Sequence, residues 1–246
     1  MPFEDINLAA LILVAALLYS SVGHAGASGY LAAMAFVGVS PAVMRPTALT
    51  LNILVAIIVT AKYYRVGAFS WHLFWPFALA SIPFAYLGGA LTLPSHIYKP
   101  LVGAVLIYSA WRAYRTAHQP AQVVTSLPHL SILLVAGAVL GFLSGLTGVG
   151  GGIFLSPLLL FFRWAEVKVI SGIAAAFILV NSIAGLLGVI TSVPALPSAL
   201  PYWAVAAVVG GFVGAEYGSK RLGNPTIQKL LAVVLVIAGA KMIAMA

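Results

Sequence analysis

Ten apolar runs follow one another along the chain, separated by short polar or Pro/Gly-rich breaks, and they constrain the fold more than any other feature. A helix needs about 20 apolar residues to cross a bilayer, and most of the runs approach that length. Charged residues make up only 7% of the 246 residues, whereas a water-soluble domain usually carries about 25%. The sequence therefore predicts an all-α multi-pass membrane protein and excludes a soluble enzyme, a nucleic-acid-binding domain and a disordered chain. The runs are 6–22, 28–39, 46–61, 72–91, 97–111, 130–146, 150–162, 169–190, 201–219 and 226–244.

Positively charged residues sort the loops to two sides of the membrane. If each half of the chain crosses five times and the N-terminus lies outside, most Lys and Arg fall inside, where membrane proteins concentrate them. The net charge of +8 therefore indicates orientation in the cytoplasmic membrane, and we expect no nucleic-acid partner. The expected inner residues are Lys62, Arg65, Arg112, Arg115, Arg163, Lys168, Lys220, Arg221 and Lys229. The expected outer residues are Arg45, Lys99 and Lys241.

A polar linker, 118–129, divides the chain into an N-terminal half, 1–117, and a C-terminal half, 130–246. Asn181 follows Asn52 by 129 residues, and the same shift superimposes two stripes of small residues on which a neighbouring helix backbone can approach closely. Because each half crosses an odd number of times, we expect two inverted repeats of about five membrane segments each. Such repeats recur in secondary transporters; a duplication that only builds a scaffold is the alternative. The stripes are Ser81, Ala85 and Gly89, and Gly210, Gly214 and Gly218.

The glycine-rich stretch 144–152 lies between two apolar runs and is the most informative motif. Each glycine inside a helix costs about 1 kcal/mol relative to alanine, so the four glycines at 148 and 150–152 predict a helix break. The break leaves free backbone N–H groups at the start of the next helix, and these favour an anion. A glycine-rich packing hinge is the alternative. The candidate binding residues are Thr147, Gly148, Gly150, Gly151 and Gly152.

A second break is expected at 20–29, again just before a short apolar run, and this stretch is more polar. Its hydroxyls could donate hydrogen bonds to an anion. His24 could donate to the substrate or carry a coupled proton, or it could be a structural histidine that bonds a neighbouring carbonyl. The candidate binding residues are Ser21, His24, Gly26, Ser28 and Gly29.

Few other polar residues lie within the apolar runs. Asn52 and Asn181 sit mid-helix, where an amide needs a partner, so each could clip a broken loop or face the ligand. Arg45, seven positions before Asn52 and about 10 Å outward, could steer an entering anion; a snorkelling interface arginine is the alternative. Glu216 and Lys220 are spaced for an i, i+4 ion pair.

At these motifs the sequence resembles the sulfite exporter TauE/SafE family of membrane transporters. The residues that carry the resemblance are GLTGVGGGIFLSPLLL at 145–160, VGHAGASGYLAAMAFVGVSP at 22–41 and the two Asn-bearing helices. The resemblance covers essentially the whole chain and implies transport of sulfite, a short sulfonate or a related anion. In the first motif His24, Ala25 and Ala27 stand where a glycine-rich run is more usual.

We expect a non-enzymatic transporter that moves a small anion across the lipid bilayer by alternating access. The chain has no cysteine and its histidines lie far apart, so we expect no metal and no cofactor; a coupled proton or cation stays open, as does the oligomeric state. An anion channel is one alternative. An intramembrane serine protease is another, because 26–29 forms a GxSG string, although His24 is a poor partner for Ser28.

Overall fold

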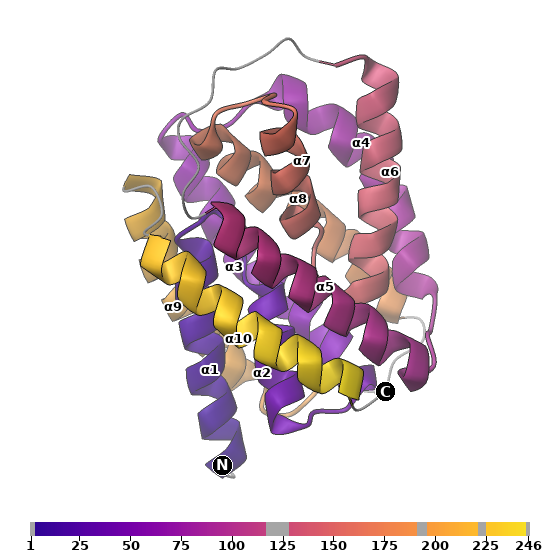
Figure 1. The fold of residues 1–246 in the computed structure, drawn as a ribbon, viewed down its shortest axis with the longest axis vertical. Helices are drawn as coiled ribbons and strands as arrows, with labels where there is room; N and C mark the ends of the chain where they lie inside the picture. Colours follow the sequence, from indigo (N-terminus) through magenta and orange to yellow (C-terminus); the bar gives the residue numbers. More distant parts are fainter. Residues whose placement is uncertain (1–2, 117–127, 191–195, 221–224, 245–246) are drawn as a thin grey trace.

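The computed structural model describes residues 3–116, 128–190, 196–220 and 225–244, and within them it contains ten helices (Figure 1). Every predicted apolar run coincides with one helix. The largest differences are at the third run, where the helix starts at Pro41 rather than Pro46 with Ser40 as its N-cap, and at the fifth, where it ends at Thr116 rather than Trp111. The helices are α1 (Phe3–Ser20), α2 (Ala27–Val37), α3 (Pro41–Arg65), α4 (Trp71–Ala90), α5 (Ser95–Thr116), α6 (Leu130–Thr147), α7 (Gly152–Phe161), α8 (Val167–Ile190), α9 (Leu200–Lys220) and α10 (Pro225–Ala244).

The helices differ in length and in apolar character. Four helices, α3, α4, α6 and α8, are long and apolar enough to span a bilayer. By contrast α2 has 11 residues and α7 has 10, so each rises about 15 Å, half of the hydrocarbon thickness. The fold is therefore that of a multi-pass helical membrane protein, and α2 and α7 are each too short to cross a bilayer as a single straight helix.

Helices that the predicted repeat would make equivalent run in opposite directions where they meet. On α3 and α8, Leu49 lies beside Gly185 and Tyr63 lies beside Gly172, so residue numbers rise on one helix as they fall on the other. Helices α5 and α10 also run antiparallel side by side (Figure 1). At their crossing, Gly103 and Gly239 face each other's carbonyl oxygens.

Glycine stripes hold two parallel helix pairs in close contact. In each pair, glycines four residues apart face successive carbonyl oxygens of the partner helix, a spacing that permits Cα–H···O contacts between helices. The predicted stripe on α9 forms one of these interfaces, and the predicted stripe on α4 meets a glycine stripe on α6 that was not predicted from the sequence. On α9, Gly210, Gly214 and Gly218 face Leu13, Leu17 and Ser21 of α1. On α6, Gly137, Gly141 and Gly145 face Phe77, Ser81 and Ala85 of α4.

These pairs interlock the two halves of the chain. Helix α4 of the first half packs on α6 and α8, and α9 of the second half packs on α1 and α3. Counting helices from the start of each half, α4 corresponds to α9, α6 to α1 and α8 to α3. The contacts of α4 and those of α9 are therefore the same under this correspondence. The boundaries 1–117, 118–129 and 130–246 stay predictions, and residues 117–127 of the linker lie outside the described part of the chain.

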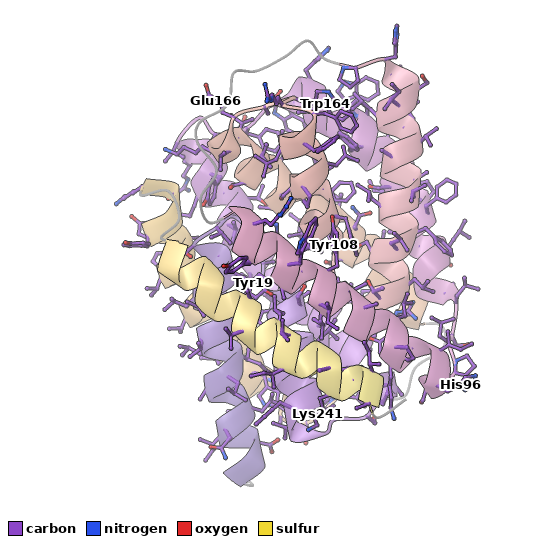
Figure 2. The ribbon with its side chains drawn as sticks, in the orientation of Figure 1. Tyr19, His96, Tyr108, Trp164, Glu166 and Lys241 are labelled. Carbon is purple, nitrogen blue, oxygen red and sulfur yellow. The ribbon has the colours of Figure 1, made fainter. Side chains whose placement is uncertain are left out.

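Several polar and charged side chains lie at the two ends of the bundle. Trp164 and Glu166 lie at one end, and His96 and Lys241 lie at the other (Figure 2). At the end of α2, Lys241 donates a 2.6 Å hydrogen bond to the carbonyl of Phe36. This sorting agrees with the sides expected for Lys241 and for the charges around Trp164; the N-terminus outside stays a prediction.

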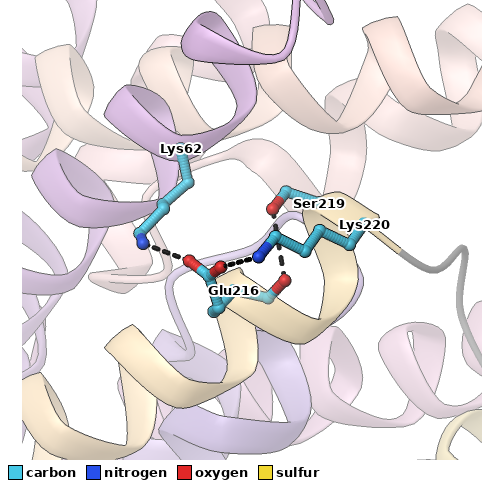
Figure 3. A network of polar contacts seen from close by, with 4 residues as sticks. All are labelled: Lys62, Glu216, Ser219 and Lys220. Carbon is cyan, nitrogen blue, oxygen red and sulfur yellow. Dashed lines mark hydrogen bonds and ion pairs between the residues drawn. The ribbon is translucent and has the colours of Figure 1, made fainter.

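The predicted ion pair between Glu216 and Lys220 is confirmed, and a third residue joins it (Figure 3). Glu216 also pairs with Lys62 from the last turn of α3. The carboxylate therefore bridges α3 and α9, which belong to different halves of the chain. The sequence spacing revealed the contact within α9 but not the contact between helices.

Arg45 is 7% exposed and caps the C-terminal end of α4. Its guanidinium donates to the carbonyl oxygens of Leu91 at 2.8 Å and Gly88 at 2.7 Å, and also to that of Gly89. These are carbonyls that a helix end leaves without an intrahelical partner. The structure thus gives Arg45 a capping contact, and its predicted role in steering an anion stays a prediction.

We expect Arg45→Leu to lower the free energy of unfolding by about 1–3 kcal/mol, because it leaves buried carbonyls unpaired. The free energy of unfolding of Arg45→Lys should lie between those of the wild type and Arg45→Leu, because an ammonium group cannot reproduce the planar, forked hydrogen bonding of a guanidinium. Thermal unfolding in detergent measures the effect. Arg65→Leu, which removes an exposed charge from the same helix, should change stability by less than about 0.5 kcal/mol; equal effects would contradict the capping role.

We expect Gly141→Leu to prevent α4 and α6 from packing, because a Cβ atom there would lie 2.6 Å from Ser81 Cα. Overpacking of this kind costs about 1–3 kcal/mol. The yield of monodisperse protein and its unfolding temperature should both drop. The control Val139→Leu, at a 54% exposed position on α6, should leave both unchanged.

Candidate anion site between two helix breaks

The first interruption, break 1 (residues 21–26), connects α1 to the short helix α2. Gly23 and Gly26 have φ angles of +82° and +114°, which side chains rarely adopt. Gly26 is the N-cap of α2 and no side chain caps the helix. The predicted break is confirmed, and it delivers an uncapped helix start.

The second interruption, break 2 (residues 148–151), connects α6 to α7. Gly148, Gly150 and Gly151 have φ angles between +79° and +82°, so the glycine run is required by backbone conformation. Gly151 is the N-cap of α7, again without a side-chain cap. A Cβ atom on Gly151 would lie 2.8 Å from the ring of Phe177, so a larger residue does not fit there.

The two breaks lie at different levels along the bundle. Gly23 of break 1 packs against Ser171 near the start of α8, at the end where α3 finishes with Lys62. Gly148 of break 2 packs against Arg45, in the early part of α3. The breaks are thus offset along the bundle.

Asn52 connects α3 to break 2. Its Nδ2 atom lies 3.4 Å from the carbonyl oxygen of Val149 and 3.4 Å from Ser182 Oγ on α8. A Cβ atom on Gly150 would lie 2.7 Å from the same nitrogen. The expectation that an asparagine clips a glycine loop therefore holds for Asn52.

Asn181 behaves differently, because its Nδ2 donates at 2.8 Å to the carbonyl of Phe177 on its own helix. In both asparagines a carbonyl acceptor fixes which way the amide faces. Among the described residues, this leaves the Oδ1 atoms of Asn52 and Asn181 buried without a hydrogen-bond partner. The hydroxyls of Ser20 and Ser144, at the ends of α1 and α6, are also buried and unpartnered.

His24 reaches from break 1 to α7, 128 residues away in sequence. Its Nε2 lies 3.3 Å from the carbonyl oxygen of Gly152 and 3.1 Å from Ser156 Oγ. Its Nδ1 lies 3.2 Å from the carbonyl oxygen of Val22. The side chain is partly exposed, whereas Ser21 and Ser28 on either side of it are buried.

Three of the other predicted residues make contacts within or between helices. The hydroxyls of Ser21 and Thr147 donate to Leu18 and Leu143 of their own helices. Gly29 lets α2 pack against α1, since a Cβ atom there would lie 2.7 Å from Ala15 Cβ. The structure brings Asn52 and His24 to the start of α7, at Val149–Gly152, but places Gly29 in a helix contact.

Ser156 and Ser182 were missed as site residues. Ser156 follows Gly152 by four residues and therefore lies on the same face of α7, and Ser182 is adjacent to Asn181. Helical spacing from the glycine motif would have identified Ser156. Nothing in the sequence distinguishes Ser182 from other small residues of α8.

This arrangement suits a small anion. Each uncapped helix start carries a partial positive charge and free N–H donors, which favour an anion. Unsatisfied backbone groups at membrane depth are tolerated only where they are buried in protein or line a cavity. Ser144 and Asn52 lie beside the start of α7. Grooves of about 460 Å³ on α6 and α7 and about 520 Å³ on α9 include none of the predicted site residues.

The protease alternative gains no support from these contacts. Both ring nitrogens of His24 face Val22, Gly152 and Ser156 rather than Ser28, and Ser28 is 2% exposed. Nucleophilic catalysis requires a hydrogen bond between the serine and its base.

Comparison with known proteins gives a consistent family. The profile described as sulfite exporter TauE/SafE matches residues 8–242. A protein of Sinorhizobium fredii named "probable membrane transporter protein" is 42% identical over 246 residues, covering 99% of this chain and 100% of its own. A protein of Methanocaldococcus jannaschii with the same description is 29% identical over 140 residues, covering 56% of this chain and 52% of its own. No solved structure matches the chain. This chain, with its two short helices that start at glycine breaks inside an apolar bundle, belongs to the sulfite exporter TauE/SafE family of membrane transporters.

Proposed function

We propose that the protein is a secondary transporter that moves a small anion across the cytoplasmic membrane by alternating access, with its N-terminus outside. The solute class is sulfite, an organosulfonate, or a related sulfur oxyanion or carboxylate. The observation that carries the proposal is the pair of helix starts at Gly26 and Gly151, which lack side-chain caps and lie in the buried interior. The sulfur chemistry rests on family membership.

Helix directions support an inverted repeat as the basis of alternating access. Helices α3 and α8, which the repeat would make equivalent, are antiparallel, and the two breaks are offset along the bundle. In transporters built from inverted repeats, one solute site near the midplane opens to each side in turn. An anion channel stays the alternative to a carrier, and the counterflow experiment below distinguishes the two.

Specific groups have distinct roles in this proposal. The backbone N–H groups of Gly150, Gly151 and Gly152 would bind the anion, together with those at Ala27 and Ser28. Asn52 would hold break 2 in position through the carbonyl of Val149. Thr147, Gly148 and Asn181 would complete the wall of the site, and Arg45 would attract the anion at the outer end.

We expect purified protein in vesicles to catalyse saturable counterflow of sulfite or a short sulfonate. Efflux of unlabelled anion should drive uptake of labelled anion, and a neutral solute of similar size should not move. If a neutral solute is carried while none of the anions is, the anion proposal is wrong. Unitary currents in planar bilayers, without counterflow, would favour the channel.

We expect Gly151→Leu to reduce counterflow by more than about tenfold, equivalent to about 1.4 kcal/mol, while leaving membrane insertion intact. The side chain would overlap Phe177 and fill the start of α7. Gly67→Leu is the matched control, because Gly67 also has a positive φ of +73° but has no atom within 4 Å of its Cβ position. Equal activity of the two variants would remove break 2 from the site.

A further inference from the structure

We propose that His24 carries a proton that is transported together with the anion, so that the solute moves as a proton–anion pair. This inference rests on the proposed function and adds the coupling ion to it. His24 is the one titratable side chain within breaks 1 and 2, and it contacts both of the segments that the anion would bind.

The contacts of the ring accommodate both of its protonation states. In the neutral state, Nδ1–H donates to the carbonyl of Val22 at 3.2 Å, and Nε2 accepts a hydrogen bond from the hydroxyl of Ser156 at 3.1 Å. When a proton from water binds to Nε2, the new N–H can donate to the carbonyl of Gly152 at 3.3 Å. Each ring nitrogen therefore faces a carbonyl acceptor that the protonated ring can use. The Ser156 hydroxyl, which can donate or accept by rotation, donates to Nε2 when the ring is neutral.

The helix starts make protonation depend on the anion. An imidazolium beside two positively polarised helix N-termini is disfavoured when the site is empty. An anion at the same N-termini reverses the local field, so that anion and proton each raise the affinity for the other. The loaded site then carries no net charge beyond that of the empty one, which suits movement through a low-dielectric interior.

The neighbouring elements supply no carboxylate hydrogen-bonded to the ring among the described residues. Helix α1 carries Tyr19 beside the break and Asp5 at its far end, α2 carries Tyr30, α8 carries Lys168 near its start, and α7 carries no titratable group. The Tyr30 hydroxyl donates to the carbonyl of Ala25. On α9, which packs on α1, Glu216 is paired with Lys62 and Lys220. We therefore assign His24 as the group that accepts the proton between the two breaks.

The experiment uses vesicles containing the full chain, with the membrane potential clamped and a short alkanesulfonate as solute, because its charge is constant between about pH 5 and 8. With one proton per anion, a gradient of about one pH unit should accumulate the sulfonate up to about tenfold. His24→Gln keeps an amide donor near Nε2 but cannot titrate. It should lose gradient-driven accumulation even where counterflow of the sulfonate remains measurable. His96→Gln, at an exposed position away from the breaks, should behave as wild type.

Each outcome decides between the two proposals. Wild-type counterflow without any response to the pH gradient, accumulation driven by a sodium gradient instead, or full accumulation by His24→Gln overturns the role of His24 and leaves the transporter in place. Absence of all anion movement in wild type removes both. If His24→Gln does not fold, proton uptake by purified wild-type protein on addition of sulfonate is measured with an indicator dye; no uptake overturns the inference.

Ser156→Ala gives a second readout that a structural role would not produce. Loss of the hydroxyl removes the hydrogen bond to the neutral ring, worth about 1 kcal/mol. The protonated state of His24 therefore becomes more stable relative to the neutral state. The pH at which sulfonate transport is half-maximal should rise by several tenths of a unit. Ser109→Ala, which removes a buried hydroxyl bonded to Val105 of its own helix, should not shift the pH profile.

Discussion

Satisfaction of backbone hydrogen bonds inside the membrane is the constraint on which the rest of this structure depends. An unsatisfied N–H or C=O group in hydrocarbon costs several kcal/mol, so a chain that interrupts two helices there must enclose both interruptions in protein. At break 2 the side-chain amide of Asn52, on α3, donates a hydrogen bond to the backbone carbonyl of Val149. Around break 1, Ser171 Oγ lies 3.3 Å from the carbonyl of Val22. Glycines at positive φ let the backbone turn without bulky side chains between the chain and these partners.

Close helix packing provides the enclosure. The stripes on α6 and α9 bring parallel helices together with carbonyl oxygens seated against glycines such as Gly145 and Gly214. Lipid offers little hydrophobic driving force for helix association, so tight van der Waals contact of small residues supplies much of it. Each stripe joins a helix of one half to a helix of the other, and the halves consequently form one bundle rather than two.

The ends of the bundle are held by different chemistry. At one end Glu216 joins α3 and α9 through Lys62. At the other, Arg45 binds the terminal carbonyls of α4. A charged side chain is costly inside a membrane unless it is paired or bonded to carbonyls, and both residues meet that condition. The asymmetry is already visible in sequence, because alanine stands at 174, the position that matches Arg45.

The sequence by itself determined the ten helices, because apolar runs of membrane length and helix-breaking glycines are local properties of the chain. It also determined the two breaks, the small-residue stripes and the Glu216–Lys220 pair, all of which depend on spacing within one segment. Even the family follows from motifs that are contiguous in the chain.

Only the tertiary structure decided which groups meet. His24 contacts Gly152 and Ser156, and Asn181 turns to its own helix although Asn52 clips a loop. Such contacts depend on the direction, offset and rotation of helices packed from opposite halves of the chain. Helical periodicity specifies which face a residue occupies, but not which residue of another helix will face it.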